Sequence, residues 1–249
     1  MPLLESRSAE SNLGNWVTDT MVQAWRGKTP GGKEVRIALA NSGGIRSSID
    51  KGNITMADLL AAFPFENTYD AVVLLGKHII MALEHSVVNM DENGGGTSGA
   101  FLQVSGLRVT YDLREPMGSR VVRVEVVEEA GGWAELEAER EYGVVVSSYL
   151  ATGGDGYQVS QWQQRSGPVT GSLDTAVMLH ILEEDGPVTS EVEGRITVIT
   201  AKSATSENTE TSAAPESLSP TADSQTSQSS RTLMLDIGLV AVSVLSTLM

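Results

Sequence analysis

The sequence predicts an α+β domain, in which helices pack on a mixed β-sheet, followed by a disordered tail. Helical and strand patterns alternate irregularly over residues 1–200 and do not repeat as regular strand–helix–strand units. Apolar residues make up 41% of the 249-residue chain, which is enough to build a core. From residue 201 onward the apolar periodicity is lost, so the folded part is expected to end there.

The first half of the domain is predicted to hold three helices and two strands. Leu13, Trp16 and Met21 recur at helical spacing, and Gly27 supplies a stop. Thr55 and Asp58 form the pattern of a capping box at the start of another helix, which Phe63-Pro64 ends. The helices are expected at 12–26, 55–62 and 77–88, and the strands at 35–40 and 71–75.

The second half is predicted to be richer in strands. Residues 107–113 and 120–127 alternate or carry β-branched side chains, and a Glu-Pro-Met-Gly turn at 115–118 joins them. Further strands are expected at 141–150 and 194–200, with a helix at 172–183 between them. The sequence shows no internal repeat.

Charge and composition exclude several classes of function. The net charge is −15 and the pI is near 4.5, so nucleic acid would meet a repulsive field, and we expect no nucleic-acid partner. Cysteine is absent, which excludes disulfides, thiolate metal sites and a cysteine nucleophile. His78, His85 and His180 lack the spacing of metal ligands, so we expect no metal site in this chain.

Two further segments follow the domain. Residues 201–230 are rich in Ser and Thr and are predicted to be a disordered stalk. Residues 231–249 form a short hydrophobic tail with no cationic anchor after it, which is typical of a GPI-attachment signal. A buried terminal strand or helix is the alternative. Residues 1–10 show no signal-peptide pattern.

Two glycine-bracketed loops carry the most informative polar residues. The Asn41 loop (residues 41–46) reads Asn-Ser-Gly-Gly-Ile-Arg, and its glycine amides and the Arg46 guanidinium suit a phosphate or carboxylate. The Asp155 loop (residues 152–156) places three glycines around one carboxylate, which suits the hydroxyls of a sugar. Ordinary turns, with a solvated arginine and a capping aspartate, are the alternatives.

Aromatic residues flank both loops in a chain with only 5% aromatics. They are Phe63, Phe65, Tyr69 and Tyr149. Such rings usually belong to the core, but rings beside polar glycine loops can also stack on a planar base. The loops and rings together indicate one polar pocket.

Six ordered motifs resemble the C-terminal domain of ecto-5′-nucleotidases over roughly residues 5–200. They are Glu-Ser-Asn-Leu-Gly-Asn at 10–15, the Asn41 loop, Phe-Pro-Phe at 63–65, Glu-His-Ser-Val at 84–87, Phe-Leu-Gln-Val-Ser-Gly at 101–106, and residues 149–156. The resemblance implies the fold of the 5′-nucleotidase C-terminal domain. It also implies a nucleotide substrate such as AMP. The hydrophobic tail fits the animal cell-surface members.

The resemblance also implies roles for six residues. Arg7 and Arg46 match the arginines that hold the substrate phosphate. Asn41 matches the asparagine that contacts the nucleoside, and Asp155 matches the carboxylate that binds the ribose hydroxyls. Phe65 and Tyr149 match the aromatic pair around the purine.

The chain departs from the vertebrate pattern at a few positions. Tyr149 replaces a phenylalanine, Ser11 replaces a cysteine, and Ala9 replaces an arginine near the phosphate. The family's hydrolysis uses two divalent metal ions, with zinc expected, in an N-terminal metallophosphatase domain whose motifs this chain lacks. We therefore expect a fragment or short isoform that binds substrate without catalysing its hydrolysis. An inactive nucleotide-binding or dimerisation module and a piece of an apyrase or UDP-sugar hydrolase are the alternatives.

The resemblance further implies a homodimer on the outer face of the plasma membrane, held by a GPI anchor. Such a location needs a signal peptide, which residues 1–10 do not provide. Asn53 begins an Asn-Ile-Thr sequon and is a glycosylation candidate.

Overall fold

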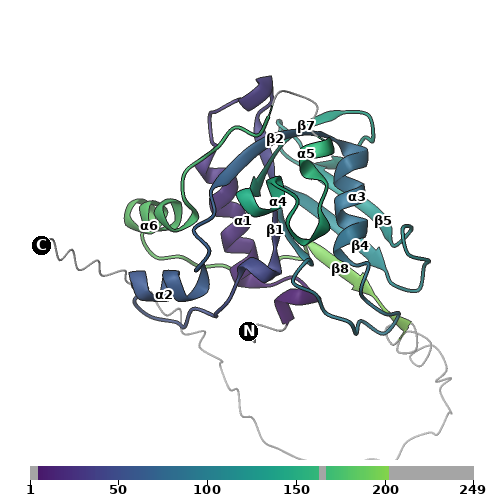
Figure 1. The fold of residues 1–249 in the computed structure, drawn as a ribbon, viewed down its shortest axis with the longest axis horizontal. Coiled ribbons are helices and arrows are strands. Elements are labelled where there is room, and N and C mark those ends of the chain that lie inside the picture. The colour runs from purple at the N-terminus through teal and green to yellow at the C-terminus, as the bar shows by residue number, and fades with distance from the viewer. Residues whose placement is uncertain (1–4, 163–166, 202–249) are drawn as a thin grey trace, which may run out of the picture.

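The computed structural model describes residues 5–162 and 167–201, which form two four-stranded sheets with helices around them (Figure 1). The α-helices are α1 (Asn12–Ala24), α2 (Met56–Ala62), α3 (Gly76–Ser86), α4 (Ser148–Ala151), α5 (Val159–Trp162) and α6 (Asp174–Asp185). The 3₁₀ turns are η1 (Glu5–Arg7), η2 (Pro30–Gly32), η3 (Ser42–Gly44) and η4 (Gly154–Gly156). None of these described helices is long and apolar enough to cross a bilayer.

The first sheet has the strand order β2-β7-β1-β3. Its strands are β1 (Val35–Asn41), β2 (Tyr69–Leu75), β3 (Leu102–Ser105) and β7 (Glu141–Ser147). β1 runs parallel to β7, whereas the other pairs are antiparallel. Both faces of β7 are buried, because Val144 and Val146 face one hydrophobic cluster and Val145 faces the other. This explains why β7 reads as a continuous apolar run.

The second sheet has the order β6-β5-β4-β8. Its strands are β4 (Leu107–Asp112), β5 (Val121–Val127), β6 (Trp133–Glu135) and β8 (Ile196–Ile199). Gly106 alone separates β4 from β3 and has φ +71°, and a Cβ there would lie 1.9 Å from the Arg36 carbonyl oxygen. Only glycine therefore lets the chain pass from one sheet to the other.

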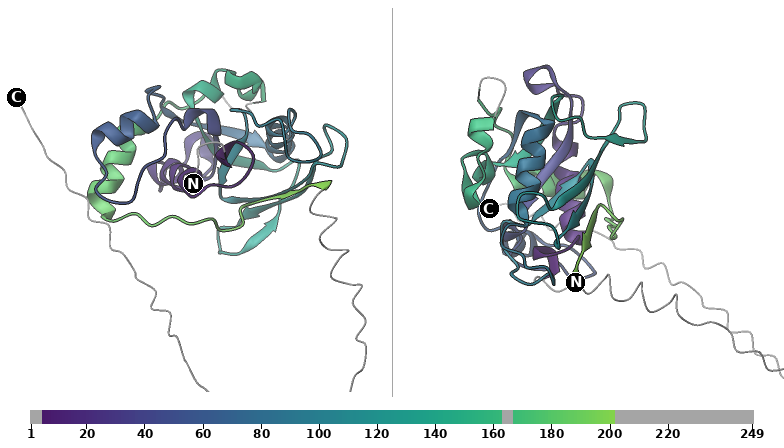
Figure 2. Two further views of the ribbon diagram at one scale, coloured as in Figure 1. Left: turned by 90° about the horizontal axis from the view of Figure 1, so that it is seen from below. Right: turned by 90° about the vertical axis from the view of Figure 1, so that its right-hand side faces the viewer.

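Helices cover both faces of the first sheet. α1, α2 and α6 share one hydrophobic cluster and lie together on the left of Figure 1. α3 lies on the other side, where its Ile79 and Leu83 pack in a cluster with residues of the second sheet. The segment after α6 then crosses the molecule to reach β8, as the left view of Figure 2 shows.

The structure confirms the predicted α+β class and most of the predicted elements. The capping box forms as expected, since Thr55 and Asp58 bond reciprocally at the start of α2. The strand predicted at 141–150 is too long, because the Ser147 side chain accepts a hydrogen bond from the Leu150 amide and caps α4. The short strands β3 and β6 were not predicted. The stalk and the hydrophobic tail, from residue 202 onward, lie outside the described residues.

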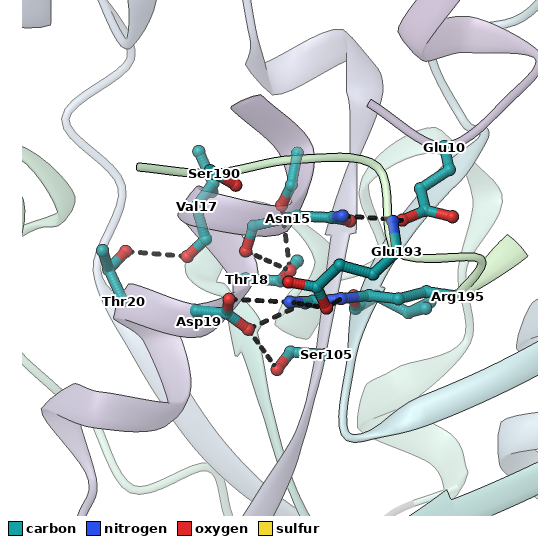
Figure 3. A network of polar contacts seen from close by, with 12 residues as sticks. Glu10, Asn15, Val17, Thr18, Asp19, Thr20, Ser105, Ser190, Glu193 and Arg195 are labelled. Atoms are coloured by element: carbon teal, nitrogen blue, oxygen red, sulfur yellow. Dashed lines mark hydrogen bonds and ion pairs between the residues drawn. The ribbon is translucent and has the colours of Figure 1, made fainter. Parts of the chain in front are cut away.

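A buried polar network fastens the segment before β8 to α1 (Figure 3). The Glu10 carboxylate is 3% exposed and accepts hydrogen bonds from the Asn15 side chain and from the Glu193 and Ile196 amides. Arg195 donates to both carboxylate oxygens of Asp19, at 2.7 and 2.8 Å. The motif at 10–15 therefore has a structural role at Glu10 and Asn15.

Replacement of Glu10 by Gln tests this network. A glutamine has one acceptor oxygen, so its amide group would face an N–H donor and leave a buried group unpaired. We expect Glu10→Gln to lower the free energy of unfolding by about 2 kcal/mol in urea titrations. The control is Glu183→Gln on the exposed face of α6, which should change little. Equal stability of the two variants would contradict the proposed role of Glu10.

Candidate functional site

The candidate site lies at the edge of the first sheet where β1 and β7 end. The two strands are parallel, with Ala38 opposite Val145 and Leu39 opposite Val146. Their carboxyl ends therefore meet at one edge, which is where open sheets commonly bind ligands. β1 leads into the Asn41 loop, and β7 leads into α4 and the Asp155 loop.

The two loops touch through their polar side chains. Asn41 is 7% exposed, and its Nδ2 donates to Asp155 Oδ2 at 2.8 Å. The Tyr149 hydroxyl donates to the other carboxylate oxygen of Asp155 at 2.8 Å. The structure thus brings together three of the six residues that the resemblance identifies.

The carboxylate also affects the acidity of its tyrosine neighbour. The hydrogen bond to Asp155, with a smaller contribution from burial, raises the pKa of the Tyr149 phenol. Ionisation of the phenol would remove the donated proton and place two negative charges side by side. Tyr149 therefore stays a hydrogen-bond donor throughout the physiological pH range.

The Asn41 loop is held by residues just before β3. The Ser42 amide donates to the Phe101 carbonyl at 2.8 Å, and the Gly43 amide donates to the Gly99 carbonyl at 2.7 Å. The expectation that both glycine amides face a ligand is therefore wrong for Gly43. A Cβ on Gly43 would lie 3.1 Å from Gly99, so this glycine permits close packing of the two loops.

Arg46 and Phe65 form a second pair beside the Asn41 loop. The Arg46 guanidinium carbon lies 5.7 Å from the centroid of the Phe65 ring, and the Arg46 amide donates to the Ala62 carbonyl at the end of α2. Phe65 is 55% exposed, whereas Phe63 is buried in the core. The charge of Arg46 and one face of an aromatic ring are thus presented together to solvent.

Arg7 approaches the same loop from the amino-terminal side. It lies in η1, which contacts η3 of the Asn41 loop. Its Nε is buried and has no hydrogen-bond partner in the described structure. A buried donor without a partner is costly, so an acceptor from a ligand would stabilise this arginine.

Gln103 in β3 fixes the segment that carries Arg7. Its Nε2 donates to the Ser6 and Ala9 carbonyls at 2.8 Å each, and its Oε1 accepts from the Ser11 amide at 3.0 Å. A Cβ on Gly14 would overlap the Gln103 side chain, which accounts for the glycine in the 10–15 motif. Sequence reasoning did not single out Gln103, although the 101–106 motif contains it.

The four flanking aromatics separate into two groups. Phe63 and Tyr69 are 4% and 3% exposed and belong to the core, whereas Phe65 and Tyr149 are 55% and 43% exposed. The Tyr149 ring packs closely on the loop, since a Cβ on Gly154 would lie 2.4 Å from it. Only Phe65 and Tyr149 are therefore available to stack on a base.

The described residues contain no group of His, Asp and Glu that could hold a metal ion. His85 instead donates a hydrogen bond to the Asp155 carbonyl, and His180 lies exposed on α6. Asn53, the glycosylation candidate, is exposed in the loop before α2.

A cavity of about 440 Å³ lies near the start of β1, at the opposite end from Asn41. Its lining comes from the end of α1, the start of β1, the end of β3, the second sheet and the segment before β8. Three of its four arginines already have partners: Arg36 pairs with Glu34, Arg195 pairs with Asp19, and Arg108 stacks over Trp133 at 4.2 Å. The edge that holds Asn41 and Asp155 is therefore the better candidate site.

Comparisons with known proteins point to one family. The model of the 5′-nucleotidase C-terminal domain matches residues 2–161. An apyrase of Tabanus yao is 35% identical over 198 residues, which cover 78% of this chain and 35% of the relative. The 5′-nucleotidase of Mus musculus is 36% identical over 76% of this chain and 34% of the relative. The chain thus spans about a third of the length of these two relatives.

A solved structure shows the same arrangement. The 5′-nucleotidase precursor of Thermus thermophilus superposes with a TM-score of 0.71 at 43% identity, covering 80% of this chain and 37% of that one. The NAD nucleotidase of Haemophilus influenzae, at 22% identity and a TM-score of 0.64, shares the fold.

The phenol of Tyr149 gives a direct test of its contact with Asp155. In the folded protein Tyr149 should ionise above the ordinary tyrosine value of about 10. Asp155→Asn removes the carboxylate and should lower the pKa of Tyr149 toward that value. The pH dependence of phenolate absorbance, with the Tyr149→Phe signal subtracted, measures this change. Glu183→Gln on α6 is the control, and an identical pKa in Asp155→Asn and wild type would refute the contact.

Proposed function

We propose a substrate-binding role for this chain, which belongs to the 5′-nucleotidase family and matches its C-terminal domain. The domain binds a nucleoside monophosphate such as AMP at the edge where β1 and β7 end. The observation that carries the proposal is the clamped Asp155 carboxylate, which lies between Asn41 and Tyr149.

Asp155 suits the ribose. Each of its carboxylate oxygens accepts one hydrogen bond from the protein and retains a further lone pair. The two ribose hydroxyls can therefore donate one to each oxygen while Asn41 and Tyr149 stay in place. The exposed rings of Phe65 and Tyr149 provide the surface on which the base stacks.

The arginines suit the phosphate. Arg7 has a buried Nε without a partner in the described structure, and the exposed Arg46 guanidinium donates one 3.3 Å hydrogen bond, to the Gly43 carbonyl. Two guanidiniums near the Asn41 loop create local positive charge in a chain whose net charge is −15. The phosphate is thus held by local groups against an unfavourable overall field.

We assign the hydrolysis step to a separate domain that is not among the described residues. In this proposal a metallophosphatase domain of the full enzyme would hold two divalent metal ions, with zinc expected, and these would supply the activated water. The role of this domain is to orient the phosphate toward that centre. The chain by itself is then expected to release no phosphate from AMP when zinc is added.

We also propose a cellular location and an oligomeric state for the full enzyme. We place it outside the cell, with residues 231–249 as a GPI-attachment signal, and we expect a homodimer. Similar proteins named snake venom 5′-nucleotidase, for example from Naja atra at 37% identity, support an extracellular location because venom is secreted. The similarity to an apyrase keeps nucleoside di- and triphosphates as a second candidate substrate class.

Calorimetry on the full chain tests the proposed site. We expect AMP to bind, and Phe65→Ala and Asp155→Ala each to weaken binding by about tenfold or more, since they remove a stacking face and the ribose acceptor. Met117→Ala, at an exposed turn distant in sequence, is the matched control. ADP and ATP in the same titrations decide between the two substrate classes.

The alternatives give distinct outcomes. A chain that binds AMP but gives no activity after joining to a metallophosphatase domain would be an inactive binding module. The proposed function would be overturned if the wild-type chain showed no binding at millimolar nucleotide and Phe65→Ala and Asp155→Ala gave the same result.

A further inference from the structure

Asp155 adopts a backbone conformation that needs outside support. Its φ is +52°, and in the described residues Glu66 is the only other non-glycine with a positive φ. Left-handed backbone is unfavourable for a residue with a Cβ, and it persists where surrounding contacts enforce it. Gly153 and Gly156 on either side also have positive φ and supply little stiffness of their own.

One of these contacts comes from His85 in the last turn of α3. Its Nε2 lies 2.8 Å from the Asp155 carbonyl oxygen, and because a carbonyl only accepts, the imidazole is the donor. The ring also packs on the loop, since a Cβ on Gly156 would lie 3.2 Å from His85 Cε1.

The imidazole itself is held in place. It makes an edge-on contact with the Tyr157 ring, at 4.6 Å between centroids. Tyr157 is 2% exposed, and its hydroxyl donates to the Ala100 carbonyl at 2.6 Å. His85 therefore links the Asp155 loop to rigid parts of the core.

The contacts of Asp155 divide into two kinds. The Tyr149 hydroxyl accepts from the Asp155 amide, and His85 donates to the Asp155 carbonyl, so both ends of the residue's backbone are fixed. The carboxylate is then directed toward Asn41. Unlike Tyr149 and Asn41, His85 contacts only the backbone and leaves both carboxylate oxygens to the ligand.

We propose that His85 is a positioning residue that holds Asp155 in its left-handed conformation and thereby sets the preference for ribonucleotides over nucleotides without ribose hydroxyls. This inference rests on the proposed function for its second half, because it takes Asp155 as the acceptor of the ribose hydroxyls. The first half concerns the ligand-free protein and stands apart from any substrate.

Three variants of the full chain separate the roles of the histidine. His85→Phe keeps a ring against Tyr157 and removes the donor. His85→Gln restores an N–H donor of similar reach. His180→Phe makes the same chemical change at an exposed position of α6 and is the matched control. Should His85→Phe fail to fold, His85→Asn replaces it, because its shorter amide falls short of the carbonyl.

Amide hydrogen exchange in the ligand-free protein tests the support of the loop. The amides of Asp155, Gly156 and Tyr157 all donate within the loop or to Tyr149. We expect them to exchange about tenfold faster in His85→Phe, because the loop opens more often. His85→Gln and His180→Phe should keep wild-type rates. Wild-type exchange in His85→Phe would overturn the positioning role.

Binding of AMP and of 2′,3′-dideoxy-AMP tests the consequence for specificity. We expect the wild-type preference for AMP to fall about tenfold in His85→Phe and to return in His85→Gln. If His85→Phe shows faster amide exchange but keeps the wild-type preference for AMP, the proposed effect on specificity is overturned and the positioning role stands. If the wild-type chain binds neither nucleotide, the proposed function fails, while the exchange rates still decide whether His85 positions Asp155.

Discussion

The candidate site depends on the parallel pairing of β1 with β7. Because the two strands run side by side in the same direction, Asn41 and Ser147 end them at one edge of the sheet. About a hundred residues of chain separate the two loops, yet the strand register brings the Asn41 side chain to 2.8 Å from Asp155. Gly143 fixes that register, because a Cβ at its position would lie 2.4 Å from the Glu34 carbonyl oxygen and a shift by one residue would place a larger side chain there.

Around this edge, buried groups hold the loops and strands in place, whereas most of the side chains that we propose to contact the ligand are exposed. Gln103 and Glu10 are almost fully buried and satisfy backbone groups of segments far away in sequence. Arg46, Phe65 and Tyr149 are exposed. A change of chemistry at these exposed side chains would therefore leave the buried frame intact.

Sequence reasoning predicted those parts of the fold that have a local cause. The period of apolar residues predicted α1, and the Thr55–Asp58 capping box predicted α2. β3 and β6 were missed because they are short and, unlike the equally short β8 with its Ile-Thr-Val-Ile run, carry few β-branched residues. The end of β7 was misplaced because a serine cap, rather than hydrophobicity, decides where the helical turn begins.

In the candidate site, too, sequence reasoning found the residues that a local pattern marks and missed those that act on distant segments. Arg46 and Asp155 stand out in the sequence because glycines surround them. His85 and Gln103 do not, because each acts on backbone carbonyls of distant segments, and no local pattern marks such contacts. The role of Gly43 was misread for a related reason, since its amide partner, Gly99, lies in another loop.

We infer that this edge of the sheet is already shaped for a nucleoside monophosphate. A crystal structure of the full chain with AMP tests it most directly. We expect the adenine to lie against the rings of Phe65 and Tyr149, the ribose hydroxyls to bond to Asp155, and the phosphate to lie beside Arg7 and Arg46. AMP bound elsewhere, for example in the cavity near the start of β1, with the contacts of Asp155 unchanged, would rule this out.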